Sequence, residues 1–181
     1  MASTILTHPE LEALKKAIRD VPDFPKKGIV FKDISTLLQN PKHLKKAIDA
    51  MAAHYAGKKI DVVVGIEARG FIFGSALAYL LGAGFILLRK KGKLPWETVE
   101  VTYDLEYGKD TIAIHRDAFS GGKNALLVDD LLATGGTLVG ACQLVEKCGG
   151  NVAGICTLVE LNFLNGREKL SKYDLFSLLQ F

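Results

Sequence analysis

The chain has 181 residues, of which 49% are hydrophobic, and its formal net charge at pH 7 is +3. This length predicts one domain of ordinary size with a substantial core, and so small a net charge argues against a nucleic-acid partner. No apolar stretch reaches the roughly eighteen residues of a membrane span, and the N-terminal sequence MASTILTHPE lacks the pattern of a signal peptide. We therefore expect a cytoplasmic, globular protein that does not bind membranes.

Capping and proline signals predict the first elements. Thr7 and Glu10 have the spacing of a capping box, so an amphipathic helix should start here and end at the prolines of residues 22–25. Residues 28–33 then form a short strand or an extended loop. Asn40 should cap a second, longer helix, because an asparagine followed by proline is typical of a helix N-terminus.

Two strand–helix–strand units are predicted in the rest of the chain. In the first, residues 61–64 form a buried strand, a helix over residues 71–81 ends at Gly82, and residues 85–88 return as a strand. The second unit has a strand, a helix and a strand over residues 124–128, 137–147 and 152–159. Together they predict an α/β fold with a mostly parallel, twisted sheet of about five strands and helices on both faces.

Residues 89–115 lie between the two units, and a parallel sheet does not explain them. Their alternation of apolar and polar residues on either side of Gly108 predicts a hairpin that is polar and only half buried. Four of the five residues from Arg89 to Lys93 are basic. Such a run is usually a solvated loop, but a long polar segment between core strands is also typical of a lid over an anionic substrate.

The stretch ALLVDDLLATGGT, residues 125–137, is the most informative part of the sequence. Its apolar start predicts a strand covered on both faces, and Asp129 and Asp130 follow at the expected end of that strand. Burying an unpaired carboxylate costs several kcal/mol. We therefore expect both side chains to project into the crevice beyond the strand, where open α/β sheets bind their ligands.

The loop after these two acids has the features of a phosphate site. Its residues are small, its two glycines can adopt positive φ, and a helix N-terminus follows, so backbone N–H groups can converge on one anion. A similar loop at residues 65–70 predicts a second anion site at the same edge of the sheet. Phosphate bound by a loop and hydroxyls bound by carboxylates describe a sugar phosphate. The alternative is an ordinary strand-to-helix turn without a ligand.

Residues 128–137, VDDLLATGGT, resemble the phosphoribosyl-pyrophosphate (PRPP) motif of type I phosphoribosyltransferases, in the form found in the adenine phosphoribosyltransferase family. The resemblance covers nearly the whole chain. Its other motifs are FPKKGIVFKDIS (24–35), GIEARGFIFG (65–74), RKKGKLP (89–95), YDLEYG (103–108) and VELNFLNGREKL (159–170).

This resemblance implies a type I phosphoribosyltransferase fold and a homodimeric purine salvage enzyme that transfers the 5-phosphoribosyl group from PRPP to adenine, giving AMP and pyrophosphate. It implies a single domain over residues 1–181, with a hood over the base at about residues 1–35 and a flexible lid at about residues 89–115. Magnesium (Mg²⁺) is expected mainly on PRPP and pyrophosphate oxygens, because the sequence offers no complete set of protein ligands for it.

The resemblance also implies roles for individual residues. PRPP and AMP are expected to bind Asp129, Asp130, Ala133, Thr134, Gly135, Gly136 and Thr137. Pyrophosphate is expected to contact Glu67, Ala68, Arg69, Arg89 and Lys93, with Arg89 reaching the site of the other subunit. Adenine is expected to contact Ile29, Val30 and Lys32, where the family usually has Arg, and Glu106 is expected to act at the purine N7 side. An alternative for Arg69 is a surface ion pair with Glu67.

Two other functions remain open at this point. A phosphoribosyltransferase for hypoxanthine, guanine or xanthine would carry the same PRPP motif, although the hood motif and Glu106 favour adenine. A non-catalytic PRPP-sensing regulator would reuse the same fold, but it is expected to carry a DNA-binding segment, for which we find no room before residue 24.

Overall fold

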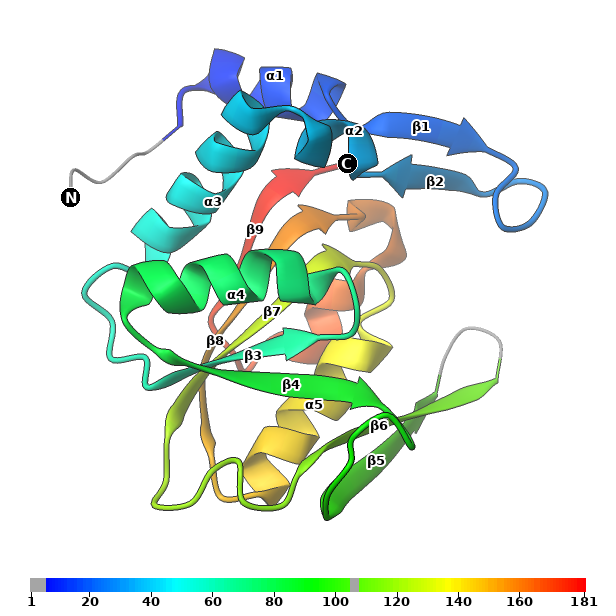
Figure 1. Ribbon diagram of the computed structural model, residues 1–181. Helices are drawn as coiled ribbons and strands as arrows, with labels where there is room; N and C mark the ends of the chain where they lie inside the picture. The colour runs from blue at the N-terminus through cyan, green and yellow to red at the C-terminus, as the bar shows by residue number, and fades with distance from the viewer. Residues whose placement is uncertain (1–5, 105–107) are drawn as a thin grey trace. The chain divides into compact units, whose positions relative to one another are not determined.

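The computed structural model describes residues 6–104 and 108–181. The chain divides into two compact units, residues 1–54 and 55–181 (Figure 1). Within the described part of the chain, none of the helices is both long enough and apolar enough to cross a membrane.

The N-terminal unit combines helices with a small antiparallel ribbon. Its elements are α1 (His8–Lys16), β1 (Arg19–Pro22), β2 (Val30–Asp33), α2 (Ser35–Gln39) and most of α3 (Pro41–Tyr55). The capping box is confirmed, because the backbone N–H of Thr7 donates to the Glu10 carboxylate over 2.9 Å. Asn40 caps α3 as predicted, since its side-chain oxygen accepts hydrogen bonds from the N–H groups of Lys42 and His43.

The ribbon corrects the prediction for the first helix. That helix ends at Lys16, well before the prolines, and β1 pairs antiparallel with β2. Ion pairs from Arg19 to Asp33 and from Lys32 to Asp20 join the two strands. Such cross-strand pairs stabilise a ribbon, and their residues are too far apart in the sequence for a helix pattern to reveal them.

The C-terminal unit contains a seven-stranded sheet in the order β5-β6-β4-β3-β7-β8-β9. Its strands are β3 (Val62–Ile66), β4 (Gly84–Lys90), β5 (Thr98–Asp104), β6 (Lys109–His115), β7 (Asn124–Leu132), β8 (Asn151–Glu160) and β9 (Leu175–Gln180). The five strands from β4 to β9 in that order are parallel, which confirms the predicted α/β fold. Strand β9, which pairs with β8, was not predicted from the sequence.

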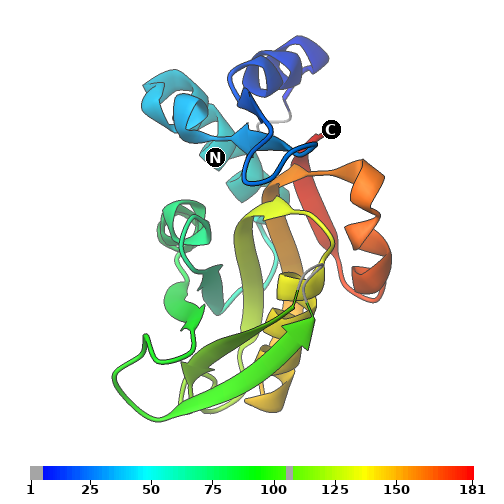
Figure 2. The same ribbon diagram turned by 90° about the vertical axis from the view of Figure 1, so that its right-hand side faces the viewer.

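Two helices cover opposite faces of this sheet (Figure 2). On one face α4 (Gly70–Leu81) packs on β3 and β7, and it ends at Gly82, whose left-handed conformation was the predicted stop. On the other face α5 (Gly136–Lys147) contributes side chains such as Leu138 and Ala141 to the main hydrophobic core. The remaining elements are the 3₁₀ helices η1 (Asn162–Leu164) and η2 (Gly166–Leu170).

The predicted hairpin exists, but it is part of the sheet. Strands β5 and β6 pair antiparallel with each other, and β6 also pairs with the end of β4 through Arg89 and Lys90. The side chains of Ile112 and Ile114 are buried in the main core, so the base of the hairpin is less polar than predicted. The hairpin thereby continues the sheet beyond β4 (Figure 1).

Candidate active site

The two acids of the PRPP motif lie inside a strand. The strand predicted to end at Val128 continues as β7 to Leu132, and Asp129 is paired in register with Thr157 of β8. Asp129 and Asp130 are only 9% and 6% exposed. The expectation that neither acid would be buried in the core was therefore wrong.

Gly70 explains much of this burial. It is the first residue of α4, and a Cβ atom at this position would lie 2.6 Å from the carbonyl oxygen of Val128 and 3.1 Å from Oδ1 of Asp129. Real Cβ atoms essentially never approach another atom to less than 3.0 Å, so the first of these contacts could not form. The absence of a side chain at Gly70 thus allows the start of α4 to lie directly on the acid pair.

The charged forms of the two acids are unfavourable, because both carboxylates are buried and they lie next to each other. Burial, and then the neighbouring Asp130 carboxylate, raise the pKa of Asp129 well above its ordinary value. Burial also raises the pKa of Asp130, although the Arg69 guanidinium opposes this shift from 2.6 Å, measured between Nε and Oδ2. Adjacent buried acids with raised pKa values are typical of functional sites, because structure alone does not favour them.

Arg69 comes from the second predicted anion loop, which reaches the acid pair. The loop follows β3, directly before α4, and contains a cis peptide bond between Glu67 and Ala68. Arg69 pairs with the buried Asp130. Its role is therefore not limited to a surface ion pair with Glu67, which was the alternative. Carboxyl ends of parallel strands meet at one sheet edge, which explains why the ends of β3 and β7 bring the two loops together.

Glu67 holds Arg89 in place. Nη2 and Nε of Arg89 lie 3.0 and 3.3 Å from the Glu67 carboxylate, and the backbone N–H of Lys90 donates to the same group over 2.9 Å. Burial raises the pKa of Glu67, but these hydrogen bonds outweigh it and hold the pKa below the ordinary value. Arg89 also donates to the carbonyl oxygen of Lys93 over 3.0 Å. The predicted pyrophosphate residues are therefore neighbours at one sheet edge.

Of the two glycines in the predicted phosphate loop, Gly135 alone adopts a positive φ. Gly135 adopts a φ of +82° and caps α5, while Gly136 is the first residue of that helix. The first N–H groups of a helix have no partner within the helix, so they remain available to an anion. Thr137 donates to the hydroxyl of Tyr103 over 3.3 Å, which brings β5 of the hairpin next to the loop. No role was predicted for Tyr103.

The predicted adenine residues belong to the N-terminal unit. Ile29 and Val30 are exposed, at 40% and 50%, beside the exposed Phe24. Lys32 is paired with Asp20 over 2.7 Å. Glu106, the predicted catalytic residue, lies outside the described residues. Among residues 6–104 and 108–181, no cluster of three or more His, Cys, Asp or Glu side chains is arranged to hold a metal ion.

One residue at this edge received no role in the sequence analysis. Gly166 belongs to the C-terminal motif VELNFLNGREKL, and its backbone lies against the phosphate loop. The only local signal was the Asn-Gly pair, which indicates a turn without indicating what the turn contacts.

Comparison with known proteins identifies the family. Residues 33–179 match the phosphoribosyl transferase domain family. The chain is 55% identical over 171 residues to the adenine phosphoribosyltransferase of Syntrophotalea carbinolica, covering 94% of this chain and 100% of that protein. Solved structures of two adenine phosphoribosyltransferases are also similar. The Thermoanaerobacter pseudethanolicus protein has a TM-score of 0.91 at 51% identity, covering 94% of this chain and 99% of the other.

The second solved structure comes from Saccharomyces cerevisiae and contains adenine and an imino-altritol bisphosphate. It has a TM-score of 0.89 at 42% identity, covering 96% of this chain and 100% of the other. These similarities span nearly the full length of each chain and include the region of the acid pair and both anion loops. The chain therefore belongs to the phosphoribosyl transferase domain family and, within it, to the adenine phosphoribosyltransferases.

Proposed function

We propose that this protein is a purine salvage enzyme that transfers the 5-phosphoribosyl group from PRPP to adenine, giving AMP and pyrophosphate. The observation that carries the proposal is the buried acid pair, Asp129 and Asp130, directly before a phosphate loop and next to Arg69. The adenine and the bisphosphate in the yeast relative support the same two substrate classes for this chain.

The chemistry needs stabilisation of opposite charges at two places. As the bond at ribose C1 breaks, positive charge develops on the sugar, and the departing pyrophosphate gains negative charge. In our proposal Asp129 and Asp130 accept hydrogen bonds from the ribose hydroxyls and place negative charge near the sugar. The loop from Ala133 to Thr137 holds the 5-phosphate, since its N–H groups point away from the helix they begin.

In the same proposal, the pyrophosphate group binds the basic residues at this edge of the sheet and the loop that contains Arg69. Arg69 offsets the charge of Asp130 before substrate arrives, and Arg89 is held ready by Glu67. Ala68 and Lys93 complete this set. Mg²⁺ fits such a site through substrate oxygens, with the hard carboxylate oxygens of the acid pair nearby, and it would neutralise charge on the leaving group.

Adenine recognition is assigned to Ile29, Val30 and Lys32, with Glu106 at the purine N7 side. Among these, Lys32 differs from the usual Arg, and a lysine is a point donor where an arginine is a planar fork. The hood at about residues 1–35 and the lid at about residues 89–115 are parts of the same proposal.

Base selectivity tests the proposed function. We expect kcat/KM with PRPP to be higher for adenine than for hypoxanthine by about 1,000-fold or more, because a site built for the 6-amino group leaves polar groups unpaired when it meets a carbonyl. Steady-state assays with adenine, hypoxanthine and guanine measure this ratio. Similar values for adenine and hypoxanthine would place the chain with another purine specificity. PRPP binding without turnover of any base would favour the sensing regulator.

Glu106 gives a second test of the adenine assignment. Replacing Glu106 with Leu is expected to lower kcat for adenine by about 100-fold or more, because a general acid or hydrogen-bond partner contributes in this range. Glu100→Leu is a suitable control, since Glu100 lies on the same hairpin and pairs with the surface Lys91. An unchanged kcat in the Glu106 variant would remove this residue from the chemical step.

We also propose a homodimer, on the basis of an exposed apolar face. Ile72 and Tyr79 lie two turns apart on α4, and Tyr79 is 85% exposed. Phe85 and Leu87 alternate along β4 on the side of α4, and both are partly exposed. Arg89 continues the same alternation, because side chains two residues apart in a strand point to the same face. A second copy seated on this face would lie next to Arg89.

A further inference from the structure

The backbone of Gly166, in the C-terminal motif, lies very close to the loop from Ala133 to Thr137. A Cβ atom at Gly166 would lie 2.1 Å from the carbonyl oxygen of Ala133, 2.9 Å from the N atom of Gly135 and 3.0 Å from Cδ1 of Leu132. The contact is reciprocal, since a Cβ atom at Gly135 would lie 2.7 Å from the carbonyl oxygen of Gly166. Gly166 is not among the glycines with positive φ. A side chain at this position is therefore excluded by the close approach of the loop, and not by the backbone conformation of Gly166.

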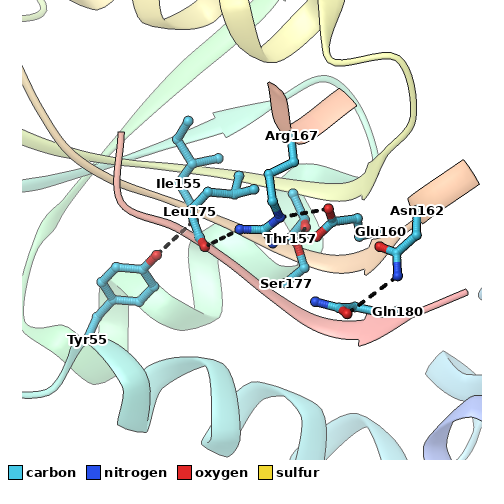
Figure 3. A network of polar contacts seen from close by, with 9 residues as sticks. All are labelled: Tyr55, Ile155, Thr157, Glu160, Asn162, Arg167, Leu175, Ser177 and Gln180. Carbon is cyan, nitrogen blue, oxygen red and sulfur yellow. Dashed lines mark hydrogen bonds and ion pairs between the residues drawn. The ribbon is translucent and has the colours of Figure 1, made fainter. Parts of the chain in front are cut away.

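An ion pair between the half-exposed Arg167 and the buried Glu160 holds Gly166 at this distance. The next residue, Arg167, donates from Nε to the Glu160 carboxylate over 2.8 Å and from Nη1 to the carbonyl oxygen of Leu175 over 3.0 Å. The side chain of Glu160, the last residue of β8, is 5% exposed. Figure 3 shows Arg167 pointing toward Glu160 and Leu175, next to Ser177 and Thr157. Arg167 thus ties the start of η2 to the sheet.

The other end of η2 is fixed by apolar packing. Leu170 is fully buried and belongs to the main hydrophobic core, together with Leu138 of α5. The segment between Glu160 and Leu170 is therefore held at both ends, by a charged anchor and an apolar one. Gly166 directly precedes the charged anchor, Arg167, and faces the phosphate loop.

We propose that Gly166 is a positioning residue for the 5-phosphate of PRPP, held in place by the Arg167–Glu160 ion pair. The inference rests on the proposed function of the loop from Ala133 to Thr137. A binding loop must hold its N–H groups within about 0.5 Å of the productive geometry. A methyl group at Gly166 would have to displace the carbonyl of Ala133 by roughly 1 Å or more to reach an ordinary contact distance. Displacement of this size misaligns the groups that bind the phosphate.

Gly166→Ala tests the proposal. We expect KM for PRPP and the dissociation constant for ribose 5-phosphate to rise about 10-fold or more, while KM for adenine and the dissociation constant for pyrophosphate change less than about 3-fold. Titration calorimetry with ribose 5-phosphate and with pyrophosphate measures the binding part without any turnover. Unchanged ribose 5-phosphate binding in folded Gly166→Ala would overturn the inference.

Gly150→Ala is the matched control. A Cβ atom at Gly150 would lie 2.5 Å from the Phe119 ring, so the variant should lose stability. Gly150 follows the C-terminal end of α5, whereas the phosphate loop precedes its N-terminus, so ribose 5-phosphate should bind as in the parent protein. An equal loss of ribose 5-phosphate affinity in Gly150→Ala would show that the effect is general destabilisation, and the inference would fail.

Arg167→Lys keeps the proposal testable if Gly166→Ala does not fold. Lysine keeps the charge near Glu160 but cannot make the forked contact, so η2 should be held less firmly. Ribose 5-phosphate should bind several-fold more weakly, and pyrophosphate should bind unchanged. Equal ribose 5-phosphate binding by Arg167→Lys and the parent protein would overturn the role of the ion pair. If the parent protein turns over no base and ribose 5-phosphate binding still weakens as described, the proposed function fails and the positioning role stands.

Discussion

Replacing either Asp129 or Asp130 with Asn is expected to lower kcat/KM for PRPP by about 100-fold or more without unfolding the protein. Asparagine keeps the shape of the side chain and removes the negative charge that the proposed mechanism places near ribose C1. Steady-state kinetics at saturating adenine and circular dichroism on the same preparations measure the two parts. Full activity in both single variants would show that the acid pair is not the site of ribose binding.

Asp61→Asn is the matched control for these two variants. Asp61 precedes β3, at the opposite ends of the parallel strands, where its carboxylate accepts a hydrogen bond from the N–H of Asn124 over 2.8 Å. An asparagine oxygen can accept the same bond. Kinetic constants of Asp61→Asn should therefore match the parent protein.

The stability of Asp129→Asn should change in the direction opposite to its activity. Burial raises the folded-state pKa of Asp129, so the protonated form is favoured by folding. Ionisation then costs folding free energy at every pH above the unfolded pKa of about 3.9, and the cost grows as the pH rises toward the folded pKa. An uncharged Asn carries no such cost. Its unfolding temperature at pH 7 should equal or exceed that of the parent protein, and the advantage should shrink as the pH falls toward about 4.

Mixing two inactive variants is expected to restore activity if Arg89 acts across a dimer. Arg89→Ala lacks the arginine and Asp129→Asn lacks the acid, so each homodimer should be nearly inactive. In a mixed dimer, one site combines an intact Asp129 with Arg89 of the neighbouring subunit. Random subunit exchange makes about half of the dimers mixed, with one intact site of two, so recovery should approach about one quarter of the parent activity.

Two controls make this result decisive. Arg116→Ala, which removes an arginine paired only at the surface with Glu97 over 3.1 Å, should be active without mixing. Differently tagged subunits show by co-purification that mixed dimers have formed. If mixed dimers form and no activity returns, Arg89 serves its own subunit, as its bond to Glu67 within one chain would then suggest.

Local signals were sufficient for much of the fold. The capping box of Thr7, the cap at Asn40 and the stop at Gly82 were all predicted, because each depends on contacts within about four residues along the chain. The apolar runs that became β3 and β7 were equally readable, since a strand covered on both faces must be apolar on both. These signals also placed both anion loops at strand ends, and the order of strands and helices predicted the parallel sheet.

Only the tertiary structure decided what surrounds those loops. The burial of Asp129 depends on the approach of α4 at Gly70, and the position of Arg89 depends on Glu67, 22 residues earlier. The pairing of β6 with β4 and of β9 with β8 joins segments that are distant in sequence. Such contacts leave no periodic signal, because neither partner has a pattern that identifies the other. The sequence by itself thus determined where the loops lie along the chain, whereas burial, ion pairing and the contact of Gly166 with Ala133 depend on distances that only the folded chain sets.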